Sequence, residues 1–589
     1  MLSEVSQAVM LHLSSPIGLA ITSVLGILCH RVHFIHGEHH QNARLYLSLW
    51  LIISILLFTI VYNVNIGGRG CDTCMNPYFL LFLLNGSFLG AMFSSIAVYR
   101  LFEHPLRHFS GPRLAAVSKL WHFSHVLRQS NHLFLDDIFH RYGTVVRTGP
   151  QELTIFDPAI WRQISGPGTS CIKGPWYDQL WPIVSISSIR TKEGYARRRK
   201  RWDEALGSVT GNEMRIHHYT SLLLRHIHAS GNTPIDVTTW FQNLAFDVMG
   251  DFGFGKSFSF TDGLSSICKK HDITTLVAQG FSMLRLFTPI PWVTGILAYL
   301  AYSLPFVTRK WNRMLNWVAQ ICDAKIRESA DFPEGHIIDR NDTNIFSQFI
   351  HSASLDGDWD SLDRLSLQGD ALAITVAGSH TTSEILTMLF FELARLTDVQ
   401  ERLRKEVAAA GLTPGILRSG NLEEILSSLS LRKIPYLDAC IDEAMRLYPA
   451  VPTGGIRQTV AKGFQLGNDW IPPNTVIVAP RWSIGRLESA FVQPNDFIPE
   501  RWTTRPSMVK EPQALNAFGA GRHSCPGKQL GMMEVRIVAA MIVANFTFVL
   551  SSAEGSKTRV VDDFVDSFTG TPGKLELVFT PLSTGSPAE

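Results

Sequence analysis

Three long stretches without a charged side chain stand near the start of the chain, before a more mixed pattern begins. They are bounded by Glu4 and Arg31, by Arg44 and Arg69, and by Asp72 and Arg100. Each is long enough for a helix of about 20 predominantly apolar residues, the length that crosses the hydrocarbon core of a bilayer. The pattern predicts transmembrane helices at about residues 11–30, 45–66 and 78–99, within a membrane anchor of residues 1–104.

The first stretch is the weakest of the three. Pro16 and several hydroxyl side chains interrupt it, and its best apolar segment covers only residues 17–29. An interfacial helix or the apolar region of a signal sequence is therefore an alternative. No lysine or arginine precedes Arg31, so the positive start of a cleavable signal is missing. We therefore interpret this stretch as an uncleaved anchor.

The loops between these stretches differ in positive charge, which predicts their orientation because cytoplasmic loops are enriched in lysine and arginine. The first loop has Arg31 and Arg44, the second has Arg69, and the segment after the third stretch has Arg100, Arg107, Arg113 and Lys119. We expect a lumenal N-terminus and a large C-terminal domain facing the cytosol at the endoplasmic reticulum membrane. Cys71 and Cys74 would then lie in the lumenal loop, as an incidental pair without the further ligands that a zinc site needs.

Residues 105–589 have the pattern of one large globular domain, and helical periodicity dominates it. Helices are predicted at 191–206, up to Asp247, at 365–396 and at 529–550. Strands are fewer: 144–148 and 153–156 form a predicted hairpin, and 476–479 follows a Pro-Pro turn. Residues 280–289 and 297–306 are either a lipid-facing roof over a pocket or ordinary core helices. The predicted fold class is mainly α with a small β-sheet.

The composition excludes several classes of function. The 589 residues include 53 lysines and arginines against 51 acidic residues, so a net charge of +2 argues against nucleic-acid binding. Charged residues are only 18% of the chain, below the roughly 25% of a typical soluble domain, which fits a protein in contact with lipid. The 8 cysteines are too irregularly spaced for a disulfide scaffold. A glycine-rich dinucleotide loop and a Walker loop are both missing from the sequence.

The strongest chemical signal is the segment 518–527, Phe-Gly-Ala-Gly-Arg-His-Ser-Cys-Pro-Gly, which precedes an apolar helical stretch. Its glycines let the backbone approach a flat ligand closely. Cys525 stands just before a helix N-terminus, where free N–H groups and the helix dipole favour a thiolate. Such a loop can hold a metal through a single sulfur. An isolated cysteine in a loop is usually structural, so the whole pattern carries the inference.

This segment resembles the cysteine-ligand signature of the cytochrome P450 family. The resemblance implies that Cys525 is the axial thiolate of haem iron and that Phe518, Gly521 and Gly527 shape the haem-binding loop. Two upstream segments also match the family in order. Glu443 and Arg446 resemble its Glu-x-x-Arg helix, and Arg501 in Pro-Glu-Arg-Trp resembles the arginine that completes a buried structural triad. The resemblance spans roughly residues 105–580 and implies the cytochrome P450 fold.

The segment Ala-Gly-Ser-His-Thr-Thr at 377–382 lies in the predicted helix 365–396. It resembles the oxygen-binding stretch of the family, where Gly378 would clear space above the metal and Thr381 would position a water for proton delivery. His380 stands where the family usually has an acid. A histidine titrating near neutrality either relays protons or only packs and hydrogen bonds, and both interpretations stay open.

Four further residues are implied to hold the haem propionates: Tyr195 and Arg199, which resemble the Trp-x-x-x-Arg helix of the family, Arg457, and His523 in the cysteine loop. Arginine suits carboxylates because it donates charge-assisted bonds. The surrounding basic run 197–201 is otherwise typical of a solvated face. We expect it to help a redox partner dock.

The resemblance implies a haem b monooxygenase that inserts one atom of O2 into a hydrophobic small molecule. Segments such as 176–178, 196–203 and 249–254 look most like fungal microsomal members, so a fungal secondary metabolite of terpenoid or indole-alkaloid type is the expected substrate. Electrons would come from NADPH-cytochrome P450 reductase in the same membrane. One alternative is a haem-thiolate isomerase or dehydratase that needs no reductase, although Thr381 argues against it. Another is a membrane haem-binding protein without enzymatic activity, for which loss of Thr381 or of the Glu-x-x-Arg pair would be expected.

Overall fold

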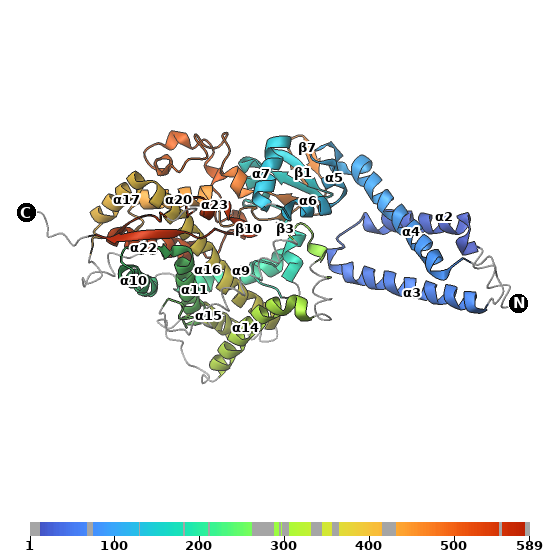
Figure 1. The fold of residues 1–589 in the computed structure, drawn as a ribbon, viewed down its shortest axis with the longest axis horizontal. Coiled ribbons are helices and arrows are strands. Elements are labelled where there is room, and N and C mark those ends of the chain that lie inside the picture. Colours follow the sequence, from blue (N-terminus) through green and yellow to red (C-terminus); the bar gives the residue numbers. More distant parts are fainter. Residues whose placement is uncertain are drawn as a thin grey trace, which may run out of the picture.

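The computed structural model describes residues 12–67, 75–128, 130–180, 183–209, 212–261, 288–293, 296, 305–330, 344–355, 364–414, 431–552 and 556–582. Cys71 and Cys74, and most of 280–289 and 297–306, lie outside these ranges. Three apolar helices at the N-terminal end project from the body of the molecule, and the C-terminus lies at the opposite end (Figure 1).

The projecting region consists of α2 (Pro16–Leu28), α3 (Ala43–Gly67) and α4 (Pro77–Val98). One turn of π-helix continues α2 to Phe34, and another continues α4 to Glu103. The stretches 16–34, 40–63 and 77–103 are each long and apolar enough to cross a membrane. The first of these overlaps the span predicted at about residues 11–30, whose first residue lies outside the described part of the chain. Pro16 fits the first turn of α2, where its missing N–H is not needed, and Ser15 caps the helix.

Side-chain contacts define how these three helices run. Thr22 Oγ1 lies 2.5 Å from Ser87 Oγ, and His30 Nδ1 lies 2.8 Å from Ser95 Oγ, so α2 and α4 run parallel. Gly26 allows their close approach, because a Cβ there would lie 2.3 Å from the Phe88 carbonyl oxygen. α3 runs the other way and is tied to α4 by a hydrogen bond from Trp50 to Asn85. The chain therefore reverses direction twice within the anchor.

The body of the molecule is mostly helical. Its helices are α5 (Arg113–Val117), α6 (Lys119–Val126), α7 (Asn131–Tyr142), α8 (Pro158–Ser165), α9 (Lys192–Val209), α10 (Glu213–Ala229), α11 (Val237–Phe254), α14 (Pro305–Ala330), α15 (Ile345–Leu355), α16 (Arg364–Arg395), α17 (Thr397–Ala409), α20 (Pro435–Leu447), α21 (Arg481–Ile484), α22 (Lys528–Asn545) and α23 (Ser556–Asp562). The long α16 confirms the helix predicted at 365–396 and lies at the centre of the body, against α11, α14, α20 and α22.

Short strands form four small sheets. The largest has the order β1 (Val145–Gly149), β2 (Glu152–Ile155), β8 (Val476–Val478), β5 (Arg457–Gln458) and β3 (Ile172–Lys173). The antiparallel pair β1 and β2 confirms the predicted hairpin, and β8 confirms the predicted strand at 476–479. The other sheets pair β4 (Ile235–Asp236), β12 (Glu576–Pro581) and β9 (Phe546–Leu550), then β10 (Val565–Ser567) with β11 (Thr569–Thr571), and β6 (Phe464–Leu466) with β7 (Asp469–Ile471).

Two predicted helix ends were wrong. The helix expected to close at Asp247 continues to Phe254 and ends at Gly255, whose φ of +73° suits glycine. Gly253 stays helical because its missing side chain leaves room for Ile374 of α16; a Cβ there would lie 2.5 Å from that residue. The helix expected over 529–550 stops at Asn545, because residues 546–550 pair with β12 as β9.

Candidate active site

The cysteine loop has an ordered backbone between the 3-10 helix Gly521–His523 and α22. Gly519 and Gly521 have φ of +73° and +63°, a region that favours glycine. A Cβ at Gly521 would also lie 2.4 Å from the Ser165 carbonyl oxygen. The Cys525 N–H donates to the Phe518 carbonyl at 2.7 Å, which closes the loop. Gly527 is the N-cap of α22, so Cys525 precedes a helix N-terminus as predicted.

Cys525 lies deep in the body, and burial raises the pKa of its thiol. The Gly527 N–H and the cations Arg199, Arg481 and Lys528 oppose this rise by favouring the thiolate. Although deep, its side chain is accessible. In α16, Ala377 is accessible too, and Thr381 is partly so, while Val376 and Ser379 beside them are buried. Cys525, Ala377 and Thr381 are thus accessible although they lie inside the body. This indicates an internal cavity that could hold a ligand.

A cluster of buried cations lies beside this loop. Lys173 and Arg457 are direct register partners in the β3–β5 pair, and they are only 5% and 4% exposed. Like charges placed opposite each other on adjacent strands are destabilising. Burial, with help from Arg457 and Arg199, lowers the pKa of Lys173 well below its ordinary value. Burial, and secondly the positive charge of Arg457, lower the pKa of His523 to about 2.

Several donors in this cluster lack a hydrogen-bond partner among the described residues: Arg457 Nε, Arg481 Nε and His523 Nδ1. Within the described part of the chain, Arg457, Arg481 and Lys173 form no ion pair with a carboxylate either. Uncompensated buried charge is costly, so such a site calls for an anionic partner. Two carboxylates would satisfy it, which are the groups that haem propionates present. The residues therefore fit haem, and Cys525 stays the predicted sulfur ligand.

Arg199 and Tyr195 contact the cysteine loop directly, through Ser524 and His523. Arg199 donates to the Ser524 carbonyl at 2.5 Å, one residue before Cys525, and pairs with Asp203 at 2.8 Å. It also donates to the Tyr195 hydroxyl at 3.3 Å. The Tyr195 ring packs edge-on against His523, with 4.4 Å between centroids. Their contact with a propionate stays a prediction.

The predicted triad is assembled in the core. Glu443 lies 2.7 Å from Arg446 Nη2 and 2.8 Å from Arg501 Nε, and all three side chains are fully buried. The Trp502 indole and the Ile498 N–H also donate to Glu443, at 2.9 Å each. The arginines donate their remaining protons to backbone carbonyls, including those of Gly485 and Val492. A buried carboxylate with this many donors is fully satisfied and ties α20 to the segment before the cysteine loop.

The three predicted residues of α16 face different neighbours. The space left by the missing side chain of Gly378 is taken by Met249 of α11, since a Cβ would lie 2.5 Å from its sulfur. His380 is buried, and burial lowers its pKa to about 4. Thr381 donates to the Ala377 carbonyl at 2.7 Å, which leaves the lone pairs of its hydroxyl available to accept. The catalytic roles of these residues stay predictions.

Sequence reasoning missed Lys173 and Arg481. Arg481 is the first residue of α21, after the strand β8, and the negative charge of Cys525 acts on its pKa, which burial lowers to about 10. A basic residue just past a predicted strand was a usable signal for Arg481. Lys173 has no such signal, because only the pairing of β3 with β5 brings it to Arg457.

Comparison with known proteins agrees with this site. Residues 173–577 match the sequence model of the family "Cytochrome P450". The chain is 33% identical to "Cytochrome P450 monooxygenase FCK2" of Fusarium pseudograminearum, over 97% of this chain and 98% of that protein. It is 31% identical to "Tryprostatin B 6-hydroxylase" of Neosartorya fischeri, over 90% and 92% of the two chains. The chain therefore belongs to the cytochrome P450 family.

Membership establishes the class of chemistry. The protein is an oxidoreductase of the P450 monooxygenase type, and its relatives act in fungal secondary metabolism. Members of the family hold haem iron through a thiolate, use O2 with a redox partner, and bind small-molecule substrates. The predicted fold, mostly helical with small sheets behind three apolar helices, is confirmed.

Proposed function

We propose that the protein is a membrane-anchored haem b monooxygenase that oxidises a hydrophobic fungal secondary metabolite, with electrons from NADPH-cytochrome P450 reductase. The observation that carries this proposal is Cys525 beside a buried cation cluster, with Thr381 at a deep accessible position on α16. When bound, haem supplies the activation of O2, and the thiolate of Cys525 donates electron density to the iron. The protein's own residues hold the ligand, exclude water and position protons.

The substrate class follows from aromatic surfaces and from the relatives. Phe568 at the turn between β10 and β11 stacks on Trp176, with 4.0 Å between ring centroids. Trp176 belongs to the 3-10 helix Pro175–Leu180, which adjoins Lys173 of the cation cluster. Flat aromatic walls favour planar apolar ligands. A relative is named as a tryprostatin B hydroxylase, so an indole alkaloid is the first class to test and a terpenoid is the second.

Spin-state spectra of the purified full chain test the substrate class directly. We expect a low-spin to high-spin shift with tryprostatin B or another indole alkaloid, weaker shifts with terpenoids, and none with short fatty acids. Turnover should need both NADPH and the reductase. A shift with every apolar compound would contradict the proposed class, and product formation from NADPH without reductase would contradict the proposed partner.

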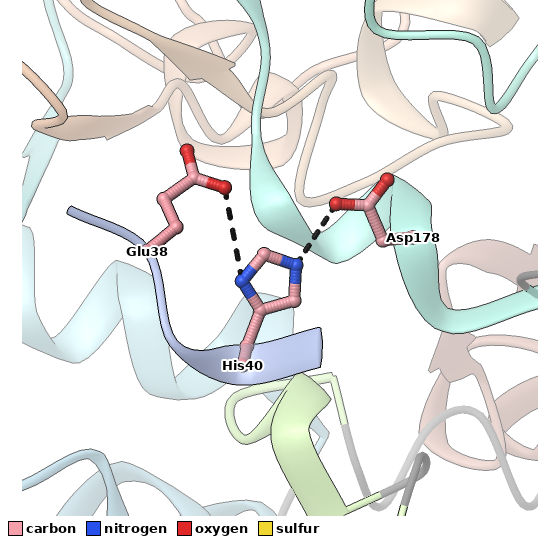
Figure 2. A group of neighbouring side chains, drawn as sticks. All are labelled: Glu38, His40 and Asp178. Atoms are coloured by element: carbon pink, nitrogen blue, oxygen red, sulfur yellow. Dashed lines mark hydrogen bonds and ion pairs between the residues drawn. The ribbon is translucent and has the colours of Figure 1, made fainter. Parts of the chain in front are cut away.

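The anchor also contacts the catalytic body, which supports the proposed topology. Glu38, between α2 and α3, pairs with Arg190 at 2.7 Å and accepts from Gln458 at 2.6 Å. His40 Nε2 lies 2.8 Å from Asp178, on the other side of the same cluster (Figure 2). A loop that contacts the catalytic body lies on the same side of the membrane as that body. With α2 and α4 parallel, this loop and the catalytic body would both face the cytosol, leaving the N-terminus and the second loop in the lumen.

The cluster of Glu38, His40 and Asp178 does not suit a metal ion, although its oxygen and nitrogen atoms lie close together. The two carboxylates approach opposite nitrogens of the His40 ring, so one ring nitrogen cannot share an ion with both (Figure 2). Arg190 already forms an ion pair with each carboxylate, at 2.7 Å from Glu38 and 2.5 Å from Asp178. We interpret the cluster as a docking contact between the anchor and the catalytic body.

Glycosylation mapping decides the topology. Acceptor sites engineered before Pro16 should be modified in microsomes, and sites in the loop 35–42 should not. Modification of the loop site with none at the N-terminus would overturn the proposed orientation of the anchor. A site placed in the loop 68–74 serves as the lumenal control.

The redox partner is expected on the cysteine-loop side. A cavity of about 600 Å³ opens there. Its lining includes Phe518 and Gly519, three basic residues and two acids: Arg432, Lys528, Arg536, Asp438 and Asp442. Arg197 and Lys200 of α9 are exposed, and Lys200 forms only a long, exposed ion pair with Glu204 at 3.8 Å. Arg198 and Arg199 are bound to less exposed carboxylates or carbonyls. Exposed positive charge accelerates encounter with an acidic partner, and salt weakens this effect. Lys200→Glu should therefore slow the first electron transfer at low salt and have little effect at high salt. An unchanged rate at low salt would contradict this docking site.

A further inference from the structure

The strand pair β3–β5 carries two cations of the cluster beside the cysteine loop, although each strand is only two residues long. Ile172 pairs with Gln458, and Lys173 pairs with Arg457. Lys173 and Arg457 have like charges and face each other across the pair, which weakens the pairing of the strands. β3 is the edge strand of its sheet and joins the sheet through β5. The position of Lys173 therefore depends on contacts from outside the strand pair.

Arg190 supplies such contacts to both strands. Its Nε donates to the Lys173 carbonyl oxygen at 3.0 Å, and its Nη2 donates to Oε1 of the Gln458 side chain at 2.5 Å. Its Nη1 donates to Asp178, in the 3-10 helix Pro175–Leu180, at 2.5 Å. A guanidinium group is planar and its donors have fixed directions, so these bonds fix the two strands and the 3-10 helix relative to one another. The side chain of Arg190 is only 14% exposed, which shields the bonds from water.

Glu38 binds Arg190 from the anchor loop, the name used here for residues 35–42. Both carboxylate oxygens take part: Arg190 Nη2 donates to Oε1 at 2.7 Å, and Nη1 donates to Oε2 at 2.8 Å. Such a two-bond contact restricts the orientation of the guanidinium group more than a single bond does. Gln458 Nε2 also donates to Glu38 Oε1, at 2.6 Å. Glu38 therefore contacts β5 directly and contacts β3 through Arg190.

His40 adds a second contact between the anchor loop and these residues. Its Nε2 lies 2.8 Å from Asp178 Oδ2, the oxygen that Arg190 also binds. Tyr177, the residue before Asp178, is buried, and its ring centroid lies 5.5 Å from Lys173 Nζ. The anchor loop thus binds residues that contact Lys173 through its backbone and beside its side chain.

We propose that Glu38 is a positioning residue for the haem site. The anchor loop holds Arg190, and Arg190 holds the strand pair that presents Lys173 and Arg457 to the haem propionates. This inference rests on the haem protein proposed above. Glu38 touches neither haem nor substrate and acts through Arg190 and Gln458. When the anchor loop leaves the body, the like charges of Lys173 and Arg457 move apart, and the site binds the propionates less tightly. Haem retention therefore depends on the docking of the membrane anchor.

The first test measures the loss of haem from the full chain in nanodiscs to a scavenging apoprotein. We expect Glu38→Ala to lose haem several-fold faster than the wild type, because Arg190 and Gln458 lose their shared acceptor. A wild-type rate of haem loss in Glu38→Ala would overturn the proposal and leave the contact with the sole role of orienting the body on the membrane.

Two other ion pairs provide matched controls. Glu103→Ala breaks a pair with Arg31 that lies within the anchor, at 2.5 Å. Asp251→Asn breaks a pair with Arg215 in the body, whose side chains are 21% and 19% exposed and thus partly buried like the pair in the anchor loop. Both variants should lose haem at the wild-type rate. Equally fast loss in either control and in Glu38→Ala would contradict a specific role of the anchor loop.

A double variant shows whether Glu38 acts through the strand pair. Gln458→Ala removes the side chain that joins β5 to Glu38 and Arg190. Glu38→Ala should therefore accelerate haem loss by a smaller factor in the Gln458→Ala protein than in the wild type. The same factor in both backgrounds would contradict the proposed route.

Hydrogen exchange of the full chain prepared without haem separates this inference from the proposed function. In Glu38→Ala, the amides of residues 170–180 and 455–460 should exchange faster than in the wild type, and in Glu103→Ala they should not. Unchanged exchange in Glu38→Ala would overturn the positioning role whether or not the chain binds haem. If the wild-type chain takes up no haem, the proposed function has failed, and the exchange result still decides whether the anchor loop holds the strand pair.

Discussion

Glu38 and Arg190 form an ion pair between the loop after the first apolar helix and the catalytic body, with 2.7 Å between Oε1 and Nη2. The two residues are separated by 152 positions in the chain, and both are partly buried. The pair lowers the pKa of the Glu38 carboxyl despite its partial burial. It therefore links the orientation of the catalytic body to that of the anchor.

A double-mutant cycle measures this link. Glu38→Ala and Arg190→Ala should each lower the free energy of unfolding, and the double variant should lose less than the sum. We expect a coupling energy of about 1 kcal/mol, because the pair is only partly shielded from solvent. Thermal unfolding of the full chain in nanodiscs gives the values. If the losses in the free energy of unfolding were additive, the ion pair would not form in the membrane-bound protein.

Cys525 should determine the spectrum of the haem-loaded protein. The reduced carbon monoxide complex should show the red-shifted Soret band of thiolate ligation, and Cys525→His should abolish it. Cys171, which is buried in the body, provides a matched control: Cys171→Ala should keep the band. If Cys525→Ala kept it, the ligand assignment would be wrong.

Removing the negative charge of Glu443 should strongly lower the stability of the fold. Glu443→Gln leaves the buried guanidinium groups of Arg446 and Arg501 without their counter-charge. We expect a loss of about 3–5 kcal/mol in stability, together with poor haem retention. Chemical unfolding of the variant and the ratio of haem to protein after purification measure both effects. Glu401→Gln, which alters an exposed pair on α17, should cost less than about 1 kcal/mol.

Replacing Lys173 should stabilise the haem-free chain but weaken haem retention in the haem-loaded protein. In the haem-free chain its charge opposes that of Arg457, so Lys173→Met should raise the unfolding temperature. In the haem-loaded protein the same charge would face propionates, so the variant should lose haem faster to a scavenging apoprotein. Lys192, which is exposed at the start of α9, is the control position. Slower haem loss in Lys173→Met would refute the propionate assignment.

His380 should make stability sensitive to acid. Its pKa is 6.5 in the unfolded chain and about 4 in the folded one, so the unfolded state binds more protons between these values. The contribution is present above pH 6.5 and is lost as the pH falls toward 4, by at most about 3 kcal/mol. His380→Asn should flatten this part of the stability curve. Denaturant unfolding at closely spaced pH values, with His132→Asn as a second buried histidine, checks the assignment. An unchanged curve would show that His380 is charged or already paired in the folded protein.

Local pattern was enough to predict several features correctly. The apolar stretches at the N-terminal end, the long helix α16 and the glycine-rich approach to Cys525 all depend on neighbouring residues in the chain. Helix length, the apolar spacing and the φ angles of Gly519 and Gly521 are local properties, so the sequence indicates them directly. The order of the family motifs leads to the further prediction that Cys525 is a haem ligand, which the carbon monoxide spectrum tests.

Contacts between distant segments required the tertiary structure. The helix predicted up to Asp247 continues through Gly253, where close packing of α11 on α16 leaves no room for a side chain. Residues 546–550 looked helical until their pairing with β12 was known. Lys173 beside Arg457, and Glu38 beside Arg190, have no signature in the pattern of either segment. The physical reason is that the charge state of a buried side chain depends on its burial, and its contacts depend on segments that are distant in the chain. The local sequence specifies neither.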